Sequence, residues 1–191
     1  MKSKKPCLVV IDMINGFVFE GSLSDKSIDK ISNNIETLIQ DFIKKGYPII
    51  NFRDSHPANA NEFNAFPSHC LENSSESEMI HQLKPYEKEM ITLLKNSTNG
   101  FMQPMFLDTF KNLDCDEYIC VGCCTDICVL QFSLSLQSYI NQNDLPVTVT
   151  VIDDCVETFN LPGHDQKEFG QMALAIMQGA GIRRVSSLRE L

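Results

Sequence analysis

The sequence has little positive charge and no long hydrophobic run. Its 16 Lys and Arg residues stand against 25 Asp and Glu residues, so the formal net charge is −9. Such an acidic surface would be repelled by nucleic acid and by anionic membranes, and we expect neither as a partner. No apolar run approaches the ~18 residues that a membrane helix needs, and no small-residue cleavage site follows the first apolar stretch. The composition favours a cytoplasmic protein with a small-molecule ligand.

The chain also has no internal repeat, no low-complexity tract and no obvious linker. Its 191 residues and 43% apolar content are enough to bury one core of ordinary size. We therefore predict a single domain over residues 1–191.

Cysteine is abundant, but its spacing is incomplete for a zinc site. Four of the eight cysteines form the pattern C-x2-C-C-x3-C between Cys120 and Cys128, and no second CxxC completes a four-cysteine set. In a reducing compartment, free cysteines are by default small buried hydrophobic residues. A non-catalytic redox or zinc-binding module remains open as an alternative of a different class.

Short β-branched runs alternate with amphipathic stretches along the chain. This alternation is typical of an α/β fold with parallel strands joined by crossover helices. Gly46 and Gly181 stand where a helix would end. The predicted strands are residues 7–12, 47–52, 90–95, 117–122, 147–152 and 183–185, and the predicted helices are 27–45, 75–82, 104–112, 126–143 and 164–180.

Chemically useful side chains follow several of the predicted strands. Ligands of parallel α/β sheets bind beyond the carboxyl ends of the strands, where Asp12, Lys95 and the cysteine cluster fall. Cys128 lies in the first turn of a helix that we expect Thr125 to cap, and the helix dipole there favours a thiolate and a lowered pKa. Together the three side chains can act as nucleophile, base and electrostatic support. Taken singly, Cys128 is equally open to interpretation as a buried structural thiol, and either Asp12 or Lys95 is more readily interpreted as a solvated charge or an ion-pair partner.

A second group of candidate residues lies in the long polar segment 53–74. Asp54 and His56 point to one side of an extended segment, and His69 can return to the same point through the loop, with Glu62 between them. Carboxylate and imidazole groups suit zinc, and also iron or manganese. The spacing alone leaves open that these are solvated loop residues. His81 and His164 lie outside this pattern, and we interpret both as surface residues.

With these two groups of residues, the chain resembles the isochorismatase-like cysteine hydrolases, and among them the nicotinamidases. Matching segments occur in the family's order over most of the chain, although each would be only a weak to moderate signal alone. The resemblance implies a three-layer α/β/α fold with a mainly parallel six-stranded, Rossmann-like sheet. The segments are LVVIDMINGF from Leu8, NFRDSHP from Asn51, FPSHC from Phe66, KNSTNGF from Lys95 and VGCCTDICV from Val121.

The resemblance also assigns roles to residues. It implies a catalytic triad of Asp12, Lys95 and Cys128, and a non-proline cis peptide bond between Cys123 and Cys124. The backbone N–H groups of Cys124 and Cys128 would form the oxyanion hole, which leaves the Cys123 and Cys124 thiols incidental. Further assignments are a substrate-binding pair, Phe17 and Phe66, and a divalent metal ion, zinc first among the candidates, held by Asp54, His56, Glu62 and His69.

The activity implied by the resemblance is hydrolysis of nicotinamide to nicotinate and ammonia through a Cys128 thioester, in NAD salvage. The rivals on the same fold are hydrolases of another small amide, a ureido compound or a vinyl ether. Isochorismatases act on a vinyl ether and do not have this metal site, so Asp54, His56 and His69 argue against that version. The family is often oligomeric, which makes a homo-oligomer possible.

Overall fold

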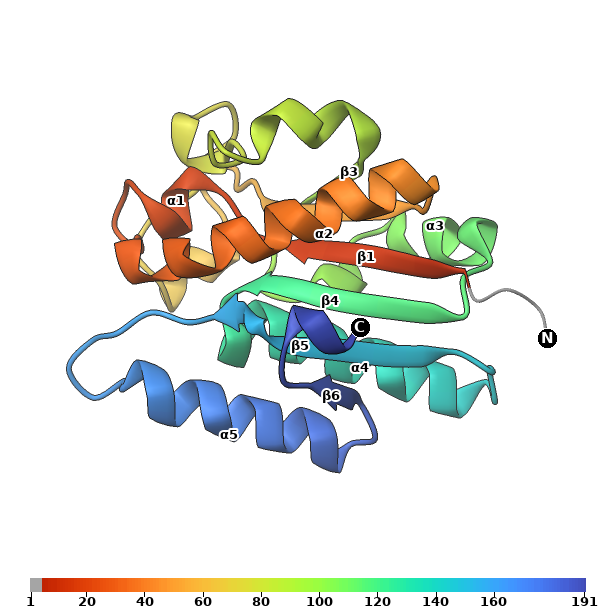
Figure 1. Ribbon diagram of the computed structural model, residues 1–191. Coiled ribbons are helices and arrows are strands. Elements are labelled where there is room, and N and C mark those ends of the chain that lie inside the picture. The colour runs from red at the N-terminus through yellow and green to blue at the C-terminus, as the bar shows by residue number, and fades with distance from the viewer. Residues whose placement is uncertain (1–4) are drawn as a thin grey trace.

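The computed structural model describes residues 5–191, so the first four residues of the predicted domain lie outside it. Six strands form one sheet in the order β3-β2-β1-β4-β5-β6, and every neighbouring pair is parallel (Figure 1). This is the Rossmann-like order, and the prediction of an α/β fold with a mainly parallel six-stranded sheet is confirmed. The strands are β1 (Pro6–Ile11), β2 (Ile49–Asp54), β3 (Ile91–Lys95), β4 (Glu117–Cys123), β5 (Thr148–Glu157) and β6 (Arg183–Val185).

Helices cover both faces of the sheet and make three layers (Figure 1). One face packs against α1 (Asn15–Val18) and α2 (Ser32–Lys45), and the other against α3 (Phe106–Leu113), α4 (Leu130–Gln142) and α5 (Gln166–Gly179). A π-helical turn, Thr125–Val129, precedes α4. Short 3₁₀ segments are Lys26–Ile31, Asn61–Asn64, Ser75–Ser77, Lys84–Glu89, Gly100–Met102 and Leu188–Glu190.

The alternation of side chains along β1 divides the core into two halves. Leu8 and Val10 enter the cluster beneath α2, whereas Val9 and Ile11 enter the cluster beneath α4. All four side chains are fully or almost fully buried, as expected for a central strand covered on both faces. The same alternation on β4 sends Cys120 and Cys123 to opposite cores, so the expectation that Cys120 is strand core is confirmed.

The sequences of α2 and α4 contain features that favour helices: a buried apolar stripe in the turn leading into α4 and along α4, and a capping glycine after α2. Val129, Phe132, Leu136 and Ile140 form the buried stripe that their spacing predicts. α2 ends at Gly46, whose φ of 67° is the left-handed conformation of a capping glycine, as predicted. The prediction that this helix begins at residue 27 is wrong, because Lys26–Ile31 forms a 3₁₀ helix and α2 begins at Ser32.

The predicted helix over residues 75–82 is wrong, because only Ser75–Ser77 forms a single 3₁₀ turn. The rest of that segment pairs with the chain that follows β1. The Ile80 N–H donates to the Met13 carbonyl at 3.0 Å, and Met79 forms an antiparallel bridge with Ile14. Backbone groups used in this pairing are unavailable for a continuing helix.

The site-forming strands meet at the point where the strand order reverses. β1 lies between β2 and β4, so Asp12, directly after β1, faces the residues that follow both neighbours. Asp12 itself has a φ of 54°, an uncommon conformation for a residue other than glycine. Ligand sites of open α/β sheets form at such a switch point. In the described part of the chain, no helix is both long and apolar enough to cross a membrane.

Gly122 provides a test of how closely β1 and β4 approach. Its φ is 118°, and an added Cβ would lie 2.0 Å from the Ile11 carbonyl oxygen. We expect Gly122→Ala to lower the free energy of unfolding by at least about 3 kcal/mol in urea titrations, because backbone cannot move aside cheaply. The matched control is Gly170→Ala within α5, where no heavy atom other than those of the two chain neighbours and the nearby helix backbone lies within 4 Å of the added Cβ. It should be neutral or stabilising by up to about 1 kcal/mol, and equal losses in the two variants would contradict the interpretation.

Candidate active site and metal centre

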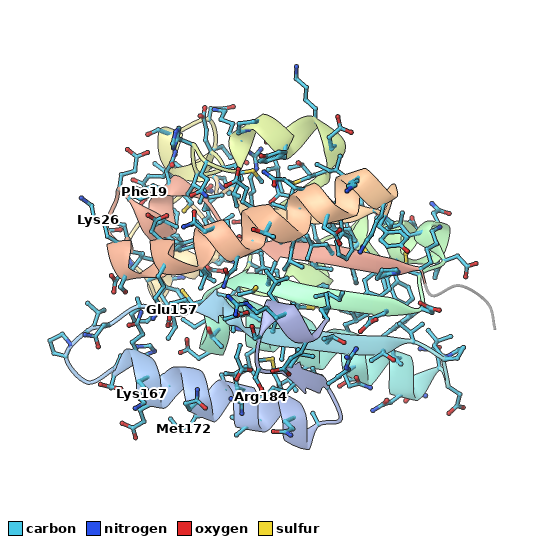
Figure 2. All side chains as sticks on the ribbon, viewed as in Figure 1. Phe19, Lys26, Glu157, Lys167, Met172 and Arg184 are labelled. Carbon is cyan, nitrogen blue, oxygen red and sulfur yellow. The ribbon has the colours of Figure 1, made fainter. Side chains whose placement is uncertain are left out.

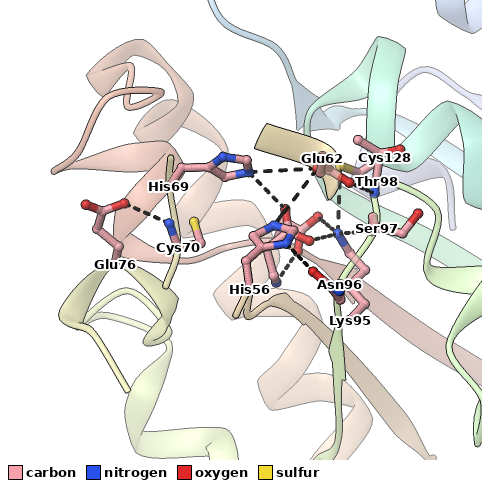
Figure 3. A network of polar contacts seen from close by, with 12 residues as sticks. His56, Glu62, His69, Cys70, Glu76, Lys95, Asn96, Ser97, Thr98 and Cys128 are labelled. Carbon is pink, nitrogen blue, oxygen red and sulfur yellow. Dashed lines mark hydrogen bonds and ion pairs between the residues drawn. The ribbon is translucent and has the colours of Figure 1, made fainter. Parts of the chain in front are cut away.

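A buried ammonium group between two carboxylates lies at the centre of the site (Figure 3). The Nζ atom of Lys95 is 2.8 Å from Asp12 Oδ2 and forms a second, short contact with Asp54 Oδ1. It also donates to the Ser97 carbonyl at 3.1 Å. All three charged side chains are at most 2% exposed, and Asp12 Oδ1 accepts from the Asp54 N–H at 3.0 Å. The ends of β1, β2 and β3 are therefore joined by one ionic cluster.

The cluster shifts the protonation of its members. Burial and the neighbouring Asp54 carboxylate raise the pKa of Asp12 to about 7, although Lys95 opposes the shift. Burial alone would lower the pKa of Lys95, but the Asp12 and Asp54 carboxylates outweigh it and hold that pKa well above its usual value. Burial would raise the pKa of Asp54, yet Lys95 and His56 bring it down. The result is one carboxyl group poised to exchange a proton near neutral pH, next to a fixed positive charge.

Cys128 lies beside this cluster. Its Sγ is 4.0 Å from Lys95 Nζ, and it lies within 4.8 Å of carboxylate oxygens of Asp12 and Asp54. Those three ligand atoms could in principle surround an ion, but the Lys95 ammonium already binds both carboxylates. The sequence-predicted Asp12, Lys95 and Cys128 are thus brought together.

Two expectations about the Cys128 turn are wrong. The turn begins as π-helix directly after Cys124, and Thr125 lies inside it, so no side chain caps its N-terminus. Burial raises the pKa of the Cys128 thiol well above its usual value, and the Asp12 and Asp54 carboxylates add to this while Lys95 opposes it. Sequence reasoning counted the helix dipole and Lys95 but not the complete desolvation of the thiol.

The segment before this turn has the geometry that the resemblance implies. The peptide bond between Cys123 and Cys124 is cis. The Cys123 thiol donates to the Asp12 carbonyl at 3.0 Å, which links the end of β4 to the end of β1. All eight cysteines are free and buried, so no disulfide is present among the described residues.

Four side chains converge beside the ionic cluster, as predicted for a metal centre (Figure 3). Asp54, His56, Glu62 and His69 offer ligand atoms that all lie within 4.8 Å of one another. His56 Nε2 is 3.6 Å from Asp54 Oδ2, and His69 Nε2 is 3.9 Å from both Asp54 Oδ2 and Glu62 Oε1. Asp54 Oδ2 and His56 Nε2 are buried without a hydrogen-bond partner. Buried polar atoms in this state fit a bound cation, because the protein leaves them otherwise unpaired.

Outer contacts orient these four side chains. His56 Nδ1 lies 2.7 Å from Asn96 Oδ1, and His69 Nδ1 lies 2.8 Å from the Pro67 carbonyl. Both partners are acceptors, so each Nδ1 carries a proton, and in the neutral form of each ring Nε2 has a free lone pair for a metal ion. Glu62 Oε2 accepts from the Thr98 N–H at 3.1 Å, which turns Oε1 toward the histidines. Sequence reasoning missed Asn96 and Thr98, although both directly follow the end of β3, where site residues were expected.

The nucleophile candidate and the metal centre share a pocket of about 530 Å³. Phe17 and Phe66 line it together with Cys124 and Cys128, as predicted for a substrate site. The Phe17 and His69 ring centroids are 5.7 Å apart. Sequence reasoning missed two further segments of the pocket lining, residues 22–26 and 159–161.

The two remaining histidines behave differently. His81 is exposed, as expected. The prediction that His164 is a surface residue is wrong: its side chain is 15% exposed, stacks on Phe159 and contacts Asp126. No sequence motif marks it, because its partners come from distant parts of the chain.

The isochorismatase domain family matches residues 6–181. Nicotinamidase 1 from Arabidopsis thaliana is 32% identical over 209 aligned residues, which cover 95% of this chain and 85% of the relative. The chain belongs to the isochorismatase family. The predicted family is therefore confirmed, and with it the prediction of an enzyme of the amidohydrolase class.

Solved structures place this isochorismatase-family chain in the same fold. N-carbamoylsarcosine amidase from Thermoplasma acidophilum matches with a TM-score of 0.81 and 22% identity, covering 98% of each chain. A pyrazinamidase from Pyrococcus horikoshii, solved in complex with zinc, matches with a TM-score of 0.79 and 23% identity, covering 95% of this chain and 99% of that one. At these identities the likeness concerns the fold alone.

The ionic cluster predicts a strong effect of neutralising Lys95. Lys95→Met leaves two buried carboxylates without their counter-charge, and should cost about 3–5 kcal/mol of unfolding free energy at pH 8. Because unpaired buried carboxyls have folded pKa values above their unfolded ones, the loss should shrink as the pH falls toward 5.5. Urea titrations at both pH values, with a chelator present, measure this.

The control is Lys45→Met. Lys45 forms an exposed ion pair with Asp41 on the surface of α2. We expect little change at either pH. A Lys95→Met loss that is small, or that grows as the pH falls, would contradict the interpretation of the cluster.

Proposed function

We propose that this enzyme hydrolyses nicotinamide to nicotinate and ammonia through a thioester on Cys128, and that the nicotinate serves NAD salvage. The observation that carries the proposal is that one pocket combines Cys128, next to Lys95 and Asp12, with an aromatic pair and a cation-type donor set. A flat heteroaromatic amide could use each of these features: the aromatic pair for its ring, the donor set through a bound cation for its ring nitrogen, and Cys128 for its carboxamide. The activity named for the Arabidopsis relative supports the choice of nicotinamide.

In the proposed reaction, Phe17 and Phe66 hold the ring, and the carboxamide carbon faces Cys128. Asp12 takes the Cys128 proton as the sulfur attacks, which agrees with the raised pKa values of both groups. Asp12 then protonates the departing ammonia, next accepts a proton from the water that attacks the thioester, and returns it to the Cys128 sulfur as nicotinate leaves. Lys95 stabilises the negative charge that moves between sulfur and carboxylate. Proton transfer concerted with attack requires no resting thiolate.

The backbone N–H groups of Cys124 and Cys128 are the proposed donors to the tetrahedral oxyanion. Both residues line the pocket, and the turn Thr125–Val129 starts between them. Such donors act through backbone position, so the Cys124 thiol has no part in the reaction.

Asp54, His56, Glu62 and His69 are the proposed ligands of one divalent metal ion, zinc first, with iron or manganese as alternatives. The unpaired Asp54 Oδ2 and His56 Nε2 and the fixed Nδ1 protons support this set. When bound, the ion supplies an electron-pair acceptor for the pyridine nitrogen. Asp54 divides its two oxygens between Lys95 and this centre.

Replacing the nucleophile tests the reaction. Cys128→Ala should reduce ammonia release from nicotinamide below detection, while nicotinamide binding stays measurable by calorimetry, because the ring contacts remain. Cys124→Ala is the matched control in the same pocket and should keep near-normal turnover. Substantial turnover by Cys128→Ala would refute the assignment, and activity on N-carbamoyl compounds but not nicotinamide or pyrazinamide would refute the proposed substrate.

The metal centre is tested by elemental analysis of protein dialysed against limiting zinc. The parent protein should hold about one equivalent, and Asp54→Ala should hold almost none. Asn96→Leu removes only the acceptor of the His56 Nδ1 proton and should weaken zinc binding by about 10–100-fold. Equal metal content in the parent and Asp54→Ala would rule out this ligand set.

The role of the ion in the reaction is tested by chelation. Removal of the metal should abolish ammonia release, and re-addition of zinc should restore it.

A further inference from the structure

The segment between β5 and α5 forms part of the pocket wall. It leaves β5 at its carboxyl end, Glu157, labelled in Figure 2, at the same end of the sheet as α1 (Figure 1). Phe159, Asn160 and Leu161 line the pocket, and Leu161 is 58% exposed. Residues 159–161 are called the outer wall here. A wall in an exposed connection needs contacts elsewhere to hold its position.

His164 lies at the base of the outer wall, between two aromatic rings. Its ring centroid is 3.9 Å from that of Phe159 with an interplanar angle of 12°, and 4.0 Å from that of Phe169 with an angle of 28°. Phe169 belongs to α5, whose residues Lys167 and Met172 point away from the sheet (Figure 2). One face of the imidazole thus supports the pocket-lining Phe159, while the other rests on the helix.

Asp126 connects this stack to the turn that holds Cys128. His164 Nε2 is 2.8 Å from Asp126 Oδ2, and the Thr158 hydroxyl donates a short hydrogen bond to Asp126 Oδ1. The two oxygens of one carboxylate therefore bind both ends of the connection, residues 158 and 164. Asp126 lies two residues before Cys128 in the same π-helical turn. The second nitrogen of the ring, His164 Nδ1, is 3.1 Å from the Phe159 carbonyl, inside the wall.

We propose that His164 is a positioning residue that holds the outer wall against the Cys128 turn mainly through its hydrogen bond to Asp126, with the Phe159 stack as a lesser contribution. It touches neither the reacting atoms nor the metal centre. Its effect is to fix the pocket width at the ring of the substrate and to limit access to Cys128. The effect on substrate binding rests on the proposed function, but the effect on access to the thiol does not.

Three substitutions separate the contacts of His164. Gln places an amide N–H where Nε2 lies and can keep the bond to Asp126. Asn places its N–H near Nδ1 and loses that bond. Phe keeps the stack between Phe159 and Phe169 but donates to neither partner. His81→Gln, at an exposed histidine, is the control.

We expect the Asn and Phe variants to raise KM for nicotinamide about tenfold with kcat within about twofold, because the outer wall moves while β4 and α4 still hold Cys128. His164→Gln should stay within about twofold of the parent in both constants. A purely structural role would instead lower kcat with the melting temperature, through a smaller active fraction, and leave KM unchanged. That result, or equal KM values in all variants, would overturn the proposal.

Modification of Cys128 by N-ethylmaleimide, read by mass spectrometry of the Cys128 peptide, gives a measurement without substrate. The rate should rise about tenfold in His164→Asn and His164→Phe, and not in His164→Gln or His81→Gln. If this pattern holds while the parent releases no ammonia from nicotinamide, the proposed function fails and the role of His164 stands. If the parent is active but all rates are equal, the role of His164 is refuted.

Discussion

The buried Lys95 ammonium is the interaction on which the site depends. It binds Asp12 after β1 and Asp54 at the end of β2, from the end of the edge strand β3. Three ionisable groups at most 2% exposed are tolerated because the Lys95 ammonium pairs with both carboxyl groups and the raised pKa of Asp12 reduces the remaining negative charge. The same arrangement separates the protonation of the two carboxyls, with the pKa of Asp12 raised by burial and Asp54 and that of Asp54 held down by Lys95 and His56. The same ionic cluster therefore joins the ends of three strands and sets the pKa values of the two carboxyl groups.

Asp54 joins the two halves of the site. One carboxylate oxygen meets Lys95, and the other faces His56 and His69. A change in the charge of the proposed metal centre would be felt by Lys95 and, through it, by Asp12 and Cys128. In the proposed reaction, substrate position and nucleophile activation would thus be linked by a single side chain. The outer wall is attached to the same region from the opposite side, because Asp126 belongs to the Cys128 turn.

Much of this could be predicted from sequence because the pattern is local. The short β-branched runs at residues 7–12 and 117–122 predicted strands, and the polar residues directly after strands predicted one edge for Asp12, Lys95 and Cys128. The helix predicted over residues 75–82 failed because pairing of Met79 and Ile80 with residues after β1 outweighed local propensity. The prediction of a lowered Cys128 pKa had the wrong direction, because the shift depends on the burial of the thiol and on carboxylates more than 70 residues away in the sequence.

By itself, the sequence determined most of the elements, the α/β class and the residue types proposed to carry the chemistry, since periodicity and strand-end position are properties of short segments. The order of the strands, the pairing of both carboxylates with one ammonium and the convergence of Asp54, His56, Glu62 and His69 were decided only by tertiary structure. Tertiary structure also decided the contacts of Asn96, Thr98 and His164, because their hydrogen-bond partners are distant in sequence or the bond uses a backbone atom. Burial and the sharing of charge between distant side chains do not exist until the chain has folded around them.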